Sequence, residues 1–533
     1  MENFLYAIWI GTVISFIFTF LVFATCYHGI FKPDYRPGYK SMPFLWFPMV
    51  YSVYKKSQRA FILSKQYNLQ CLSGMCKIFE KQGIVSFSIC GRNYVYLFTP
   101  ETVEVLLTST KLIYRSSDYD VLRPMLKDGL FTSNGNKWRS RRKLLTPAFH
   151  FKILHDFAPL MQEASRTFLS DIGCFIDEPW VDITKIMRPC TFYMMMKASL
   201  GFDTEINEEA MATFNCAEQF TTCLAARFAR PWLFPDFIFN KTSFAKKCRE
   251  SCNLVHNYVR KIILDRRKCA IKERLSLIGK EEPSVCTQNS TEENEINSCV
   301  KKIKNKSFLD LLLELHFNDP SFTVEDILDE SLIYFAAASD ALGMSMSYLL
   351  YCIGLHQDVQ KKIHKELDDI FQNTDREATL EDIKSMKYLD CVIKETQRLY
   401  GVHFLSREAT ESFKILDYTI PKGSCVVVFL HVIHRHPDFW KDPEKFDPSR
   451  FFPENSSRRN PYTYIPFAAG PRNCIAMKFS YLMLKIASST LLRKFNLKSL
   501  DNRDDLYDIN RLASEDTIPI RISFSVRENA GGY

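Results

Sequence analysis

An uncharged and strongly apolar stretch lies near the start of the chain. Residues 4–26 carry no charged side chain, and a helix of that length crosses a hydrocarbon core of about 30 Å. Glu2 precedes the stretch and Lys32 and Arg36 follow it, a charge order that places the N-terminus in the lumen and the rest in the cytosol. The pattern predicts an uncleaved, single transmembrane anchor over residues 1–31, and a buried core helix is the less favoured alternative.

Two further segments differ in composition from their surroundings. Residues 32–50 are rich in proline, which fixes φ and removes a backbone donor, so they predict a stiff hinge. Residues 279–306 are polar and lack apolar periodicity, which predicts a flexible loop. Apart from that loop, we expect residues 51–533 to fold as one domain.

The apolar positions after the hinge first predict strands and then mostly helices. Alternation over residues 85–89 and 94–98 predicts a β-hairpin. Thr99 followed by Pro100 then predicts the first residues of a helix. We therefore expect a mainly α fold with a small β-rich lobe near the N-terminal side.

A long apolar pattern in the second half of the chain predicts a central helix. It begins at Thr323, where a capping-box pattern occurs, and runs to about residue 356. Its middle is almost uncharged and could be mistaken for a second membrane span. Because Asp340 lies inside it, we interpret it as a helix buried in the domain.

Composition and charge narrow the classes of site. The chain has 46% hydrophobic residues, enough for a large core, and a formal net charge of +8. No nucleic-acid-binding module accompanies that positive charge, so nucleic-acid binding is excluded from the prediction. The 17 cysteines include no C-x-x-C pair, which argues against a zinc ribbon and favours reduced thiols.

Cys474 is the exception among the cysteines. It follows a Gly-Pro-Arg-Asn turn and precedes an apolar helical pattern, so its sulfur lies near a helix N-terminus, where backbone N–H groups favour an anion. One interpretation is an axial thiolate ligand of a metal cofactor, and the other is an ordinary buried cysteine. This segment alone leaves both open.

Four motifs in order resemble those of the cytochromes P-450. The segment Phe467–Cys474 has the spacing Phe-x-x-Gly-x-Arg-x-Cys, and Glu395 and Arg398 form Glu-x-x-Arg. Arg450 lies in "FDPSRF", and "KWRSRR" has the Trp-x-x-x-Arg spacing. Residues 137–154 and 386–400 resemble in particular the family-4 microsomal branch. The resemblance covers about residues 32–524.

The resemblance implies a fold, a cofactor and roles for named residues. The fold is the family's helical prism with its small β-lobe, and the cofactor is haem b, with Cys474 as axial ligand of the iron. Phe467 would shield the sulfur, and Glu395, Arg398 and Arg450 would form a structural ion network. The residues that would engage the haem propionates are Trp138, Arg142, Arg407 and Arg472.

The chain departs from the family pattern in its central helix. The acid is present as Asp340, to which the resemblance assigns proton delivery, but the usual alcohol position is Ala341. An alanine cannot donate a hydrogen bond, so a substrate hydroxyl, a water or a nearby serine would have to substitute. Ala337 replaces the glutamate that links haem covalently in many family-4 members, which predicts non-covalent haem. We expect an apolar substrate pocket lined by Phe335, Ala336, Ala341, Val402 and Leu405.

The favoured hypothesis is a monooxygenase of the endoplasmic reticulum membrane with a cytosolic catalytic domain. It would insert one atom of O2 into a fatty acid, terpenoid or xenobiotic, with NADPH electrons from a cytochrome reductase and cytochrome b5 as a further candidate donor. The cations of "KWRSRRK" that do not face haem would form a basic patch for the reductase. The alternatives are an O2-independent isomerase or dehydratase of a lipid hydroperoxide or endoperoxide, which Ala341 favours, and a non-catalytic haem protein.

Overall fold

The computed structural model describes residues 72–89, 92–149, 151–176, 178–200, 208–228, 233, 235–278, 307–372, 374–503 and 519–527. The predicted anchor (1–31), hinge (32–50) and loop (279–306) lie outside these residues and stay predictions. Within the described ranges, no helix combines the length and the apolar character needed to cross a membrane.

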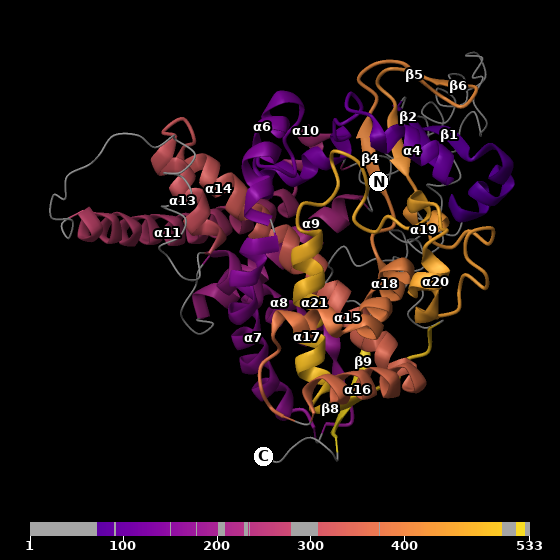
Figure 1. Ribbon diagram of the computed structural model, residues 1–533. Helices are drawn as coiled ribbons and strands as arrows, with labels where there is room; N and C mark the ends of the chain where they lie inside the picture. Colours follow the sequence, from indigo (N-terminus) through magenta and orange to yellow (C-terminus); the bar gives the residue numbers. More distant parts are fainter. Residues whose placement is uncertain are drawn as a thin grey trace, which may run out of the picture.

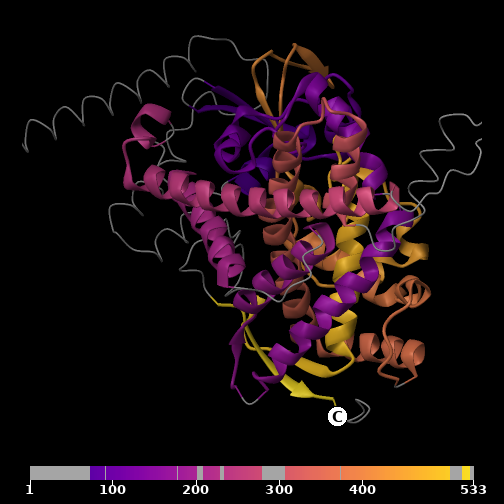
Figure 2. The same ribbon diagram turned by 90° about the vertical axis from the view of Figure 1, so that its left-hand side faces the viewer.

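Helices form most of the described structure, as their apolar periodicity predicts (Figure 1). In the view of Figure 2, the longest of them, α11, runs across the other helices. The long helices are α7 (Phe151–Gly173), α8 (Ile183–Leu200), α9 (Glu208–Phe228), α11 (Ser243–Ile278), α15 (Ser339–Leu355), α16 (Gln357–Phe371), α18 (Lys387–Tyr400) and α21 (Met477–Leu492). The shorter ones are α4 (Pro100–Thr108), α5 (Arg123–Leu126), α6 (Gly135–Leu145), α10 (Asp236–Phe239), α13 (Phe308–Asn318), α14 (Val324–Leu332), α17 (Leu380–Ser385), α19 (Leu430–Ile433) and α20 (Pro453–Ser456). Short 3-10 helices are η2 (Glu80–Gln82), η3 (Ser117–Leu122), η4 (Thr146–Phe149), η7 (Pro448–Phe451) and η8 (Pro461–Thr463).

The central helix begins where the capping-box pattern predicts. The Thr323 hydroxyl accepts from the Asp326 N–H, and the Asp326 carboxylate accepts from the Thr323 N–H (2.8 Å). The helical run α14–α15 ends at Leu355, in agreement with the prediction. Its middle, η6 (Ile333–Ala338), is a π-helix. Apolar periodicity did not predict this interruption, and π-helical turns inside α-helices occur frequently at functional sites.

The predicted hairpin is present, but its sheet is larger than the sequence indicated. Strands β1 (Ile84–Ile89) and β2 (Arg92–Leu97) pair antiparallel. β2 then pairs parallel with β7 (Cys425–Val428), and β4 (Leu405–Glu408) adds to the other edge of β7. The β-lobe therefore joins the N-terminal hairpin to a segment more than three hundred residues later, which no local pattern predicts.

Two smaller sheets complete the described strands. A three-stranded sheet contains β3 (Val181–Asp182), β9 (Arg521–Val526) and β8 (Phe495–Ser499) in that spatial order. β5 (Phe413–Ile415) and β6 (Tyr418–Ile420) form a separate hairpin.

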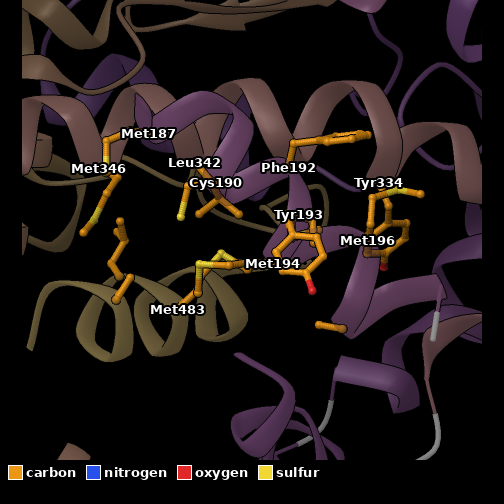
Figure 3. Packing of buried hydrophobic residues seen from close by; sticks show 14 of the residues in the cluster. Met187, Cys190, Phe192, Tyr193, Met194, Met196, Tyr334, Leu342, Met346 and Met483 are labelled. Atoms are coloured by element: carbon orange, nitrogen blue, oxygen red, sulfur yellow. The ribbon is translucent and has the colours of Figure 1, made fainter. Parts of the chain in front are cut away.

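The helical body and the β-lobe have separate hydrophobic cores. The helical core is rich in methionine and includes Met187, Met194 and Met196 of α8, Met346 of α15 and Met483 of α21 (Figure 3). Methionine side chains are flexible and fill irregular gaps between helices. Most cysteines of the described residues are buried and none of them forms a disulfide, but Cys174 and Cys269 are exposed.

Candidate active site

Cys474 lies in the turn that leads into α21. Its N–H donates to the carbonyl of Phe467 (2.9 Å), and the Asn473 N–H donates to the carbonyl of Gly470 (3.1 Å). Gly470 has a φ of 73°, and a Cβ there would lie 1.7 Å from the carbonyl oxygen of Leu107 in α4. Only glycine fits both the backbone conformation and the close approach, so this turn is fixed against α4.

The groups around Cys474 act on its charge in opposite directions. Burial raises the pKa of this thiol above its ordinary value, and a hydrogen bond from the Ala476 N–H and the charges of Arg142 and Arg115 oppose that rise. The side chain is nevertheless exposed, unlike that of most described cysteines. An accessible sulfur whose anion is stabilised by a backbone N–H and two cations is suited to bind a metal cofactor as thiolate.

Arg472 is buried next to this turn. It is 6% exposed, and within the described ranges its guanidinium donates to neutral oxygens and to no carboxylate. The acceptors of its guanidinium are the carbonyls of Ile113 (2.7 Å), Ser133 (2.6 Å) and Phe131 (3.3 Å) and the side-chain oxygen of Asn134 (3.1 Å). Carbonyl oxygens orient a guanidinium but leave its charge uncompensated.

Three more arginines lie in the same region. Arg115 donates through Nε to the carbonyl of Phe131 (2.8 Å), and Arg142 donates to the main-chain and side-chain oxygens of Asn473 (2.9 and 2.6 Å). Arg407 is buried and donates to its neighbour, the carbonyl of Ser406.

Mutual repulsion adds to the cost of burying these cations. Burial, followed by repulsion from Arg115 and Arg407, lowers the pKa of Arg472 to about 8. Burial, followed by repulsion from Arg115, lowers the pKa of Arg407 to about 9. Burying charges that repel one another is unfavourable unless a counter-charge is supplied.

The four arginines together fit a ligand with two carboxylates. Among the described residues, none of Arg115, Arg142, Arg407 and Arg472 forms an ion pair with a carboxylate. The propionates of haem would supply that counter-charge, and Cys474 would supply the ligand to its iron. The chemistry of the donor set therefore fits haem.

Trp138 and Phe467 line the same region through contacts with other side chains. The Arg472 guanidinium lies 4.9 Å from the ring centre of the buried Trp138. The ring of Phe467 lies 5.4 Å from that of Tyr481 in α21. The haem-binding role of Trp138 and the shielding role of Phe467 stay predictions.

Arg115 was not among the predicted site residues. Its only sequence signal is a single cation directly after the apolar residues 112–114, which does not indicate a ligand by itself. Its position beside Arg472 follows from the fold. Arg115 and Arg472 are far apart in the chain, but both donate to the carbonyl of Phe131.

Asp340 has an ion-pair partner that the sequence analysis did not name. Arg188 of α8 contacts its carboxylate at 2.6 Å and that of Glu218 in α9 at 2.8 Å. Burial raises the pKa of Asp340, and the charge of Arg188 opposes that rise. The adjacent Ala341, at the usual alcohol position, is exposed.

The predicted pocket residues lie in different environments. Phe335 is buried against the edge of the Phe192 ring (4.9 Å), and Leu405 packs in the core of the β-lobe. Val402 is 57% exposed, and the side chain of Ala336 lies outside the described residues.

Residues near Val402 also differ from one another in exposure. Phe404, which the sequence analysis did not name, is 52% exposed. His403, between them, is buried, and its Nδ1 lies 2.9 Å from the carbonyl oxygen of Gly401, so its polar side chain is satisfied within the protein.

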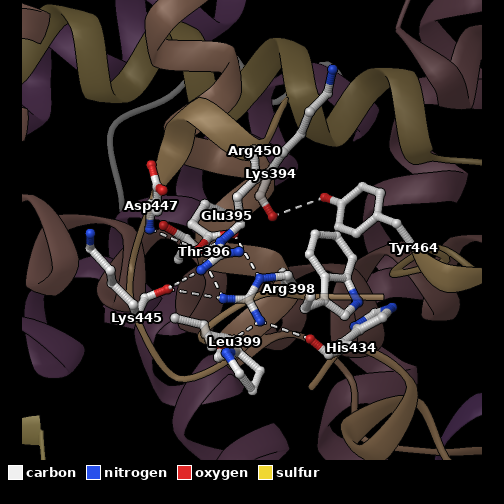
Figure 4. A network of polar contacts seen from close by, with 12 residues as sticks. Lys394, Glu395, Thr396, Arg398, Leu399, His434, Lys445, Asp447, Arg450 and Tyr464 are labelled. Atoms are coloured by element: carbon white, nitrogen blue, oxygen red, sulfur yellow. Dashed lines mark hydrogen bonds and ion pairs between the residues drawn. The ribbon is translucent and has the colours of Figure 1, made fainter. Parts of the chain in front are cut away.

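The predicted ion network forms between α18 and the segment around η7 (Figure 4). Arg398 binds both oxygens of Glu395 (2.7 and 2.8 Å), and Nε of Arg450 lies 3.4 Å from the same carboxylate. Arg398 also donates to the carbonyls of His434, Pro443 and Lys445. Glu395 and Arg398 are fully buried, so the network joins α18 to three places in the chain that follows β7.

The basic patch predicted from "KWRSRRK" is smaller than expected. Lys137 pairs with Asp128, and Arg141 pairs with Asp326. Arg142 points inward to Asn473. The exposed cations of α6 without a carboxylate partner among the described residues are Arg139 and Lys143.

Comparisons with known proteins identify similar chains. Residues 60–516 match the model of the family "Cytochrome P450". The chain is 34% identical to human "Cytochrome P450 4V2" over 77% of this chain and 76% of that protein. It is 33% identical to "Cytochrome P450 4c21" of Blattella germanica, over 80% and 83% of the two chains. It is 32% identical to "Cytochrome P450 4c3" of Drosophila melanogaster, over 81% and 80%.

Proposed function

The chain belongs to the cytochrome P450 family, in its family-4 branch, and is an oxidoreductase of the monooxygenase type; we propose that it is a membrane-bound haem-thiolate enzyme that oxygenates a lipophilic substrate. The observation that carries the proposal is the accessible Cys474 beside the buried Arg407 and Arg472 and the half-buried Arg115 and Arg142, none of which has a carboxylate partner among the described residues. Bound haem would supply the activation of O2.

The protein would hold haem without a covalent link between a side chain and the porphyrin. Cys474 would bind the iron, and the Ala476 N–H would stabilise the thiolate. Arg115, Arg142 and Arg472 would pair with the propionates, together with Arg407 and Trp138. Ala337 provides no carboxylate for a covalent bond to haem.

Proton delivery would depend on Asp340. Its carboxylate is held by Arg188, whose charge opposes the rise in pKa that burial causes. Because Ala341 has no hydroxyl, a water or a substrate hydroxyl would complete the path at that position.

A lipophilic substrate agrees with the exposed apolar side chains. Ala341, Val402 and Phe404 are exposed although they are apolar, and each is close in sequence to Asp340 or to Arg407. Fatty acids, terpenoids and xenobiotics are the classes that such a surface would accept.

Electrons would come from NADPH through a cytochrome reductase, with cytochrome b5 as a second candidate donor. Arg139 and Lys143 are the cations of α6 that remain for an acidic partner. Residues 1–31 would anchor the protein in the endoplasmic reticulum with the catalytic domain in the cytosol. Asn240 begins an Asn-Lys-Thr acceptor sequence, which is glycosylated only in the lumen. Glycosylation at Asn240 in cells would therefore contradict this orientation.

Ala341 also favours a second candidate function, the rearrangement of a lipid hydroperoxide or endoperoxide. Such a reaction needs neither external electrons nor the hydroxyl that Ala341 lacks. A haem protein without activity is the third candidate.

One experiment separates the three functions. Purified protein, reductase and NADPH are supplied with a panel of fatty acids, terpenoids and steroids under isotope-labelled O2. We expect the wild type to form product that carries the label. In Ala341→Thr, a larger share of the NADPH consumed should lead to product. In Cys474→Ser, the CO complex should lose its thiolate-type spectrum. Product without label or NADPH would establish the isomerase, and no turnover of any substrate or hydroperoxide would favour the non-catalytic protein.

A further inference from the structure

A short segment carries several acceptors of the arginine cluster. We call Lys127–Asn134 the 127–134 segment. Arg472 donates to the carbonyls of Phe131 and Ser133 within it, and Nε of Arg115 donates to the same Phe131 carbonyl. The position of this segment therefore decides where two of the four guanidinium groups lie.

The segment is braced internally, so a shift at one residue is passed to the others. The Thr132 hydroxyl donates to the carbonyl of Lys127 (2.6 Å), and the Ser133 N–H donates to that of Gly129 (2.9 Å). Lys127 has a φ of 48°, which turns the chain sharply after α5.

Helix α14 holds the segment from the other side with three carboxylates. Glu325 pairs with Lys127 (3.1 Å). The backbone N–H of Asp128 opposes the rise in the pKa of Asp329 that burial causes, and the Glu330 carboxylate accepts a hydrogen bond from the Leu130 N–H (3.0 Å). Charge-assisted bonds of this kind are stronger than bonds between neutral groups.

The backbones of the segment and of α14 also touch. A Cβ at Gly129 would lie 2.6 Å from the carbonyl oxygen of Asp329 and 2.8 Å from Cδ1 of Ile333. Any side chain at Gly129 would therefore push the segment away from α14.

Glu330 is the buried member of this contact. It is 1% exposed, and its Oε1 has no hydrogen-bond partner among the described residues. Nε of Arg141 lies 3.8 Å from that oxygen, but the same guanidinium pairs with Asp326. The other ionisable groups that act on Glu330 or are acted on by it are Lys137 of α6, Asp329 of α14 and Tyr334 of η6.

We propose that Glu330 is a positioning residue for haem binding: through the Leu130 N–H it fixes the 127–134 segment, whose carbonyls orient Arg115 and Arg472 toward the propionates. This rests on the proposed haem-binding role of those arginines. A residue of α14 thereby controls the geometry of a cofactor that it does not touch.

The protonation of Glu330 gives the proposal a pH signature. Burial, opposed by the hydrogen bond from the Leu130 N–H, raises the pKa of Glu330 to about 7. Both protonation states are therefore populated near neutral pH, and each presents a different acceptor to the Leu130 N–H. The hydrogen bonding of the propionates is expected to change with pH, with a midpoint near that value.

The test compares three variants of the full-length haem protein. Glu330→Leu removes the acceptor, Glu330→Gln keeps an amide oxygen but removes the titration, and Gly129→Ala displaces the segment from the opposite side. Glu381→Leu, at an 80% exposed carboxylate of α17, is the matched control. The readouts are the propionate-bending bands in resonance Raman spectra between pH 6 and 8 and the rate of haem transfer to apomyoglobin.

We expect Glu330→Leu and Gly129→Ala to shift the propionate bands and to lose haem about tenfold faster than wild type. Glu330→Gln should keep the wild-type rate at neutral pH but lose the pH dependence of the bands. Unchanged bands and rates in Glu330→Leu, or in Gly129→Ala if the leucine variant does not fold, would overturn the inference. A wild-type protein without a thiolate-ligated haem spectrum would instead contradict the proposed function.

Discussion

At the scale of single residues, the buried arginines are the feature that most needs a partner. Arg472 and Arg407 are held by carbonyl oxygens and repel each other and Arg115. A folded protein without haem must therefore stabilise cations in a poorly solvated place. That cost can be measured through its dependence on pH.

The first prediction concerns Arg472→Gln in haem-depleted protein. The pKa of Arg472 is about 8 in the folded state, below its ordinary value of 12.5, so between these values the unfolded chain binds more protons. The free energy of unfolding should therefore rise with pH above about 8, by at most about 1.4 kcal/mol per pH unit for this group. Urea unfolding between pH 7.5 and 9.5 should show a smaller rise in Arg472→Gln.

Arg139→Gln, on the exposed face of α6, is the control for loss of one cation and should keep the wild-type slope. Haem should flatten the slope of the wild type, because its propionates favour the charged form. Equal slopes in Arg472→Gln and wild type would contradict the assignment.

At the scale of elements, α15 is tied to α8 and α9 by one guanidinium. Arg188 of α8 is shared between Asp340 of α15 and Glu218 of α9. The backbones of α15 and α8 also approach closely at Gly343, where a Cβ would lie 2.9 Å from Cα of Arg188. The charge of Asp340 therefore depends on how three helices pack.

The second prediction uses the competition between the two carboxylates. Arg188→Leu should raise the pKa of Asp340 further, by about 1–3 units, because burial would then act without an opposing charge. The pH dependence of kcat should move to higher pH. Glu218→Gln should move it to lower pH, because Arg188 would then serve Asp340 alone. Shifts of both variants in the same direction would rule out this electrostatic link.

The third prediction is that Gly343→Ala destabilises the protein. The added methyl group would meet the Arg188 backbone, so α15 and α8 would have to separate, at a cost of about 1–3 kcal/mol. Urea unfolding measures this loss. Gly173→Ala, where nothing lies within 4 Å of the new Cβ, should change stability by less than about 1 kcal/mol. Equal losses of stability in Gly343→Ala and Gly173→Ala would show that the close approach of α8 does not exclude a side chain at residue 343.

At the scale of the whole molecule, the network around Glu395 joins the helical body to the chain that follows the β-lobe. Arg398 donates to the carbonyls of His434 and Lys445 and pairs with Glu395. The side chains of Arg398 and Glu395 are both fully buried. The Asp447 N–H donates to the same carboxylate (2.9 Å). Removing one charge would leave the others buried and unpaired.

The fourth prediction is that Glu395→Ala lowers the stability of the protein by about 3–5 kcal/mol, enough to remove most folded protein. The yield of haem-containing protein and the Tm by calorimetry measure the effect. Glu381→Ala, which breaks an exposed pair with Lys384, should cost about 1 kcal/mol or less. A stable Glu395→Ala protein would mean that the network does not hold these segments together.

Local signals in the sequence determined much of the fold. The cap at Thr323, the hairpin of β1 and β2 and the helix that opens at Pro100 were all predictable, because each depends on residues a few positions apart. The same holds for Cys474, whose turn and following helix are contiguous in the chain.

Only the tertiary structure decided which distant residues meet. The parallel pairing of β2 with β7, the ion pair of Arg188 with Asp340 and the neutralisation of Lys137 and Arg141 leave no mark at short range. Arg115 joined the candidate haem site for the same reason, because its acceptor at Phe131 also binds Arg472. Side chains far apart in the chain meet through the packing of whole elements, and that packing is settled by the entire core rather than by any one motif.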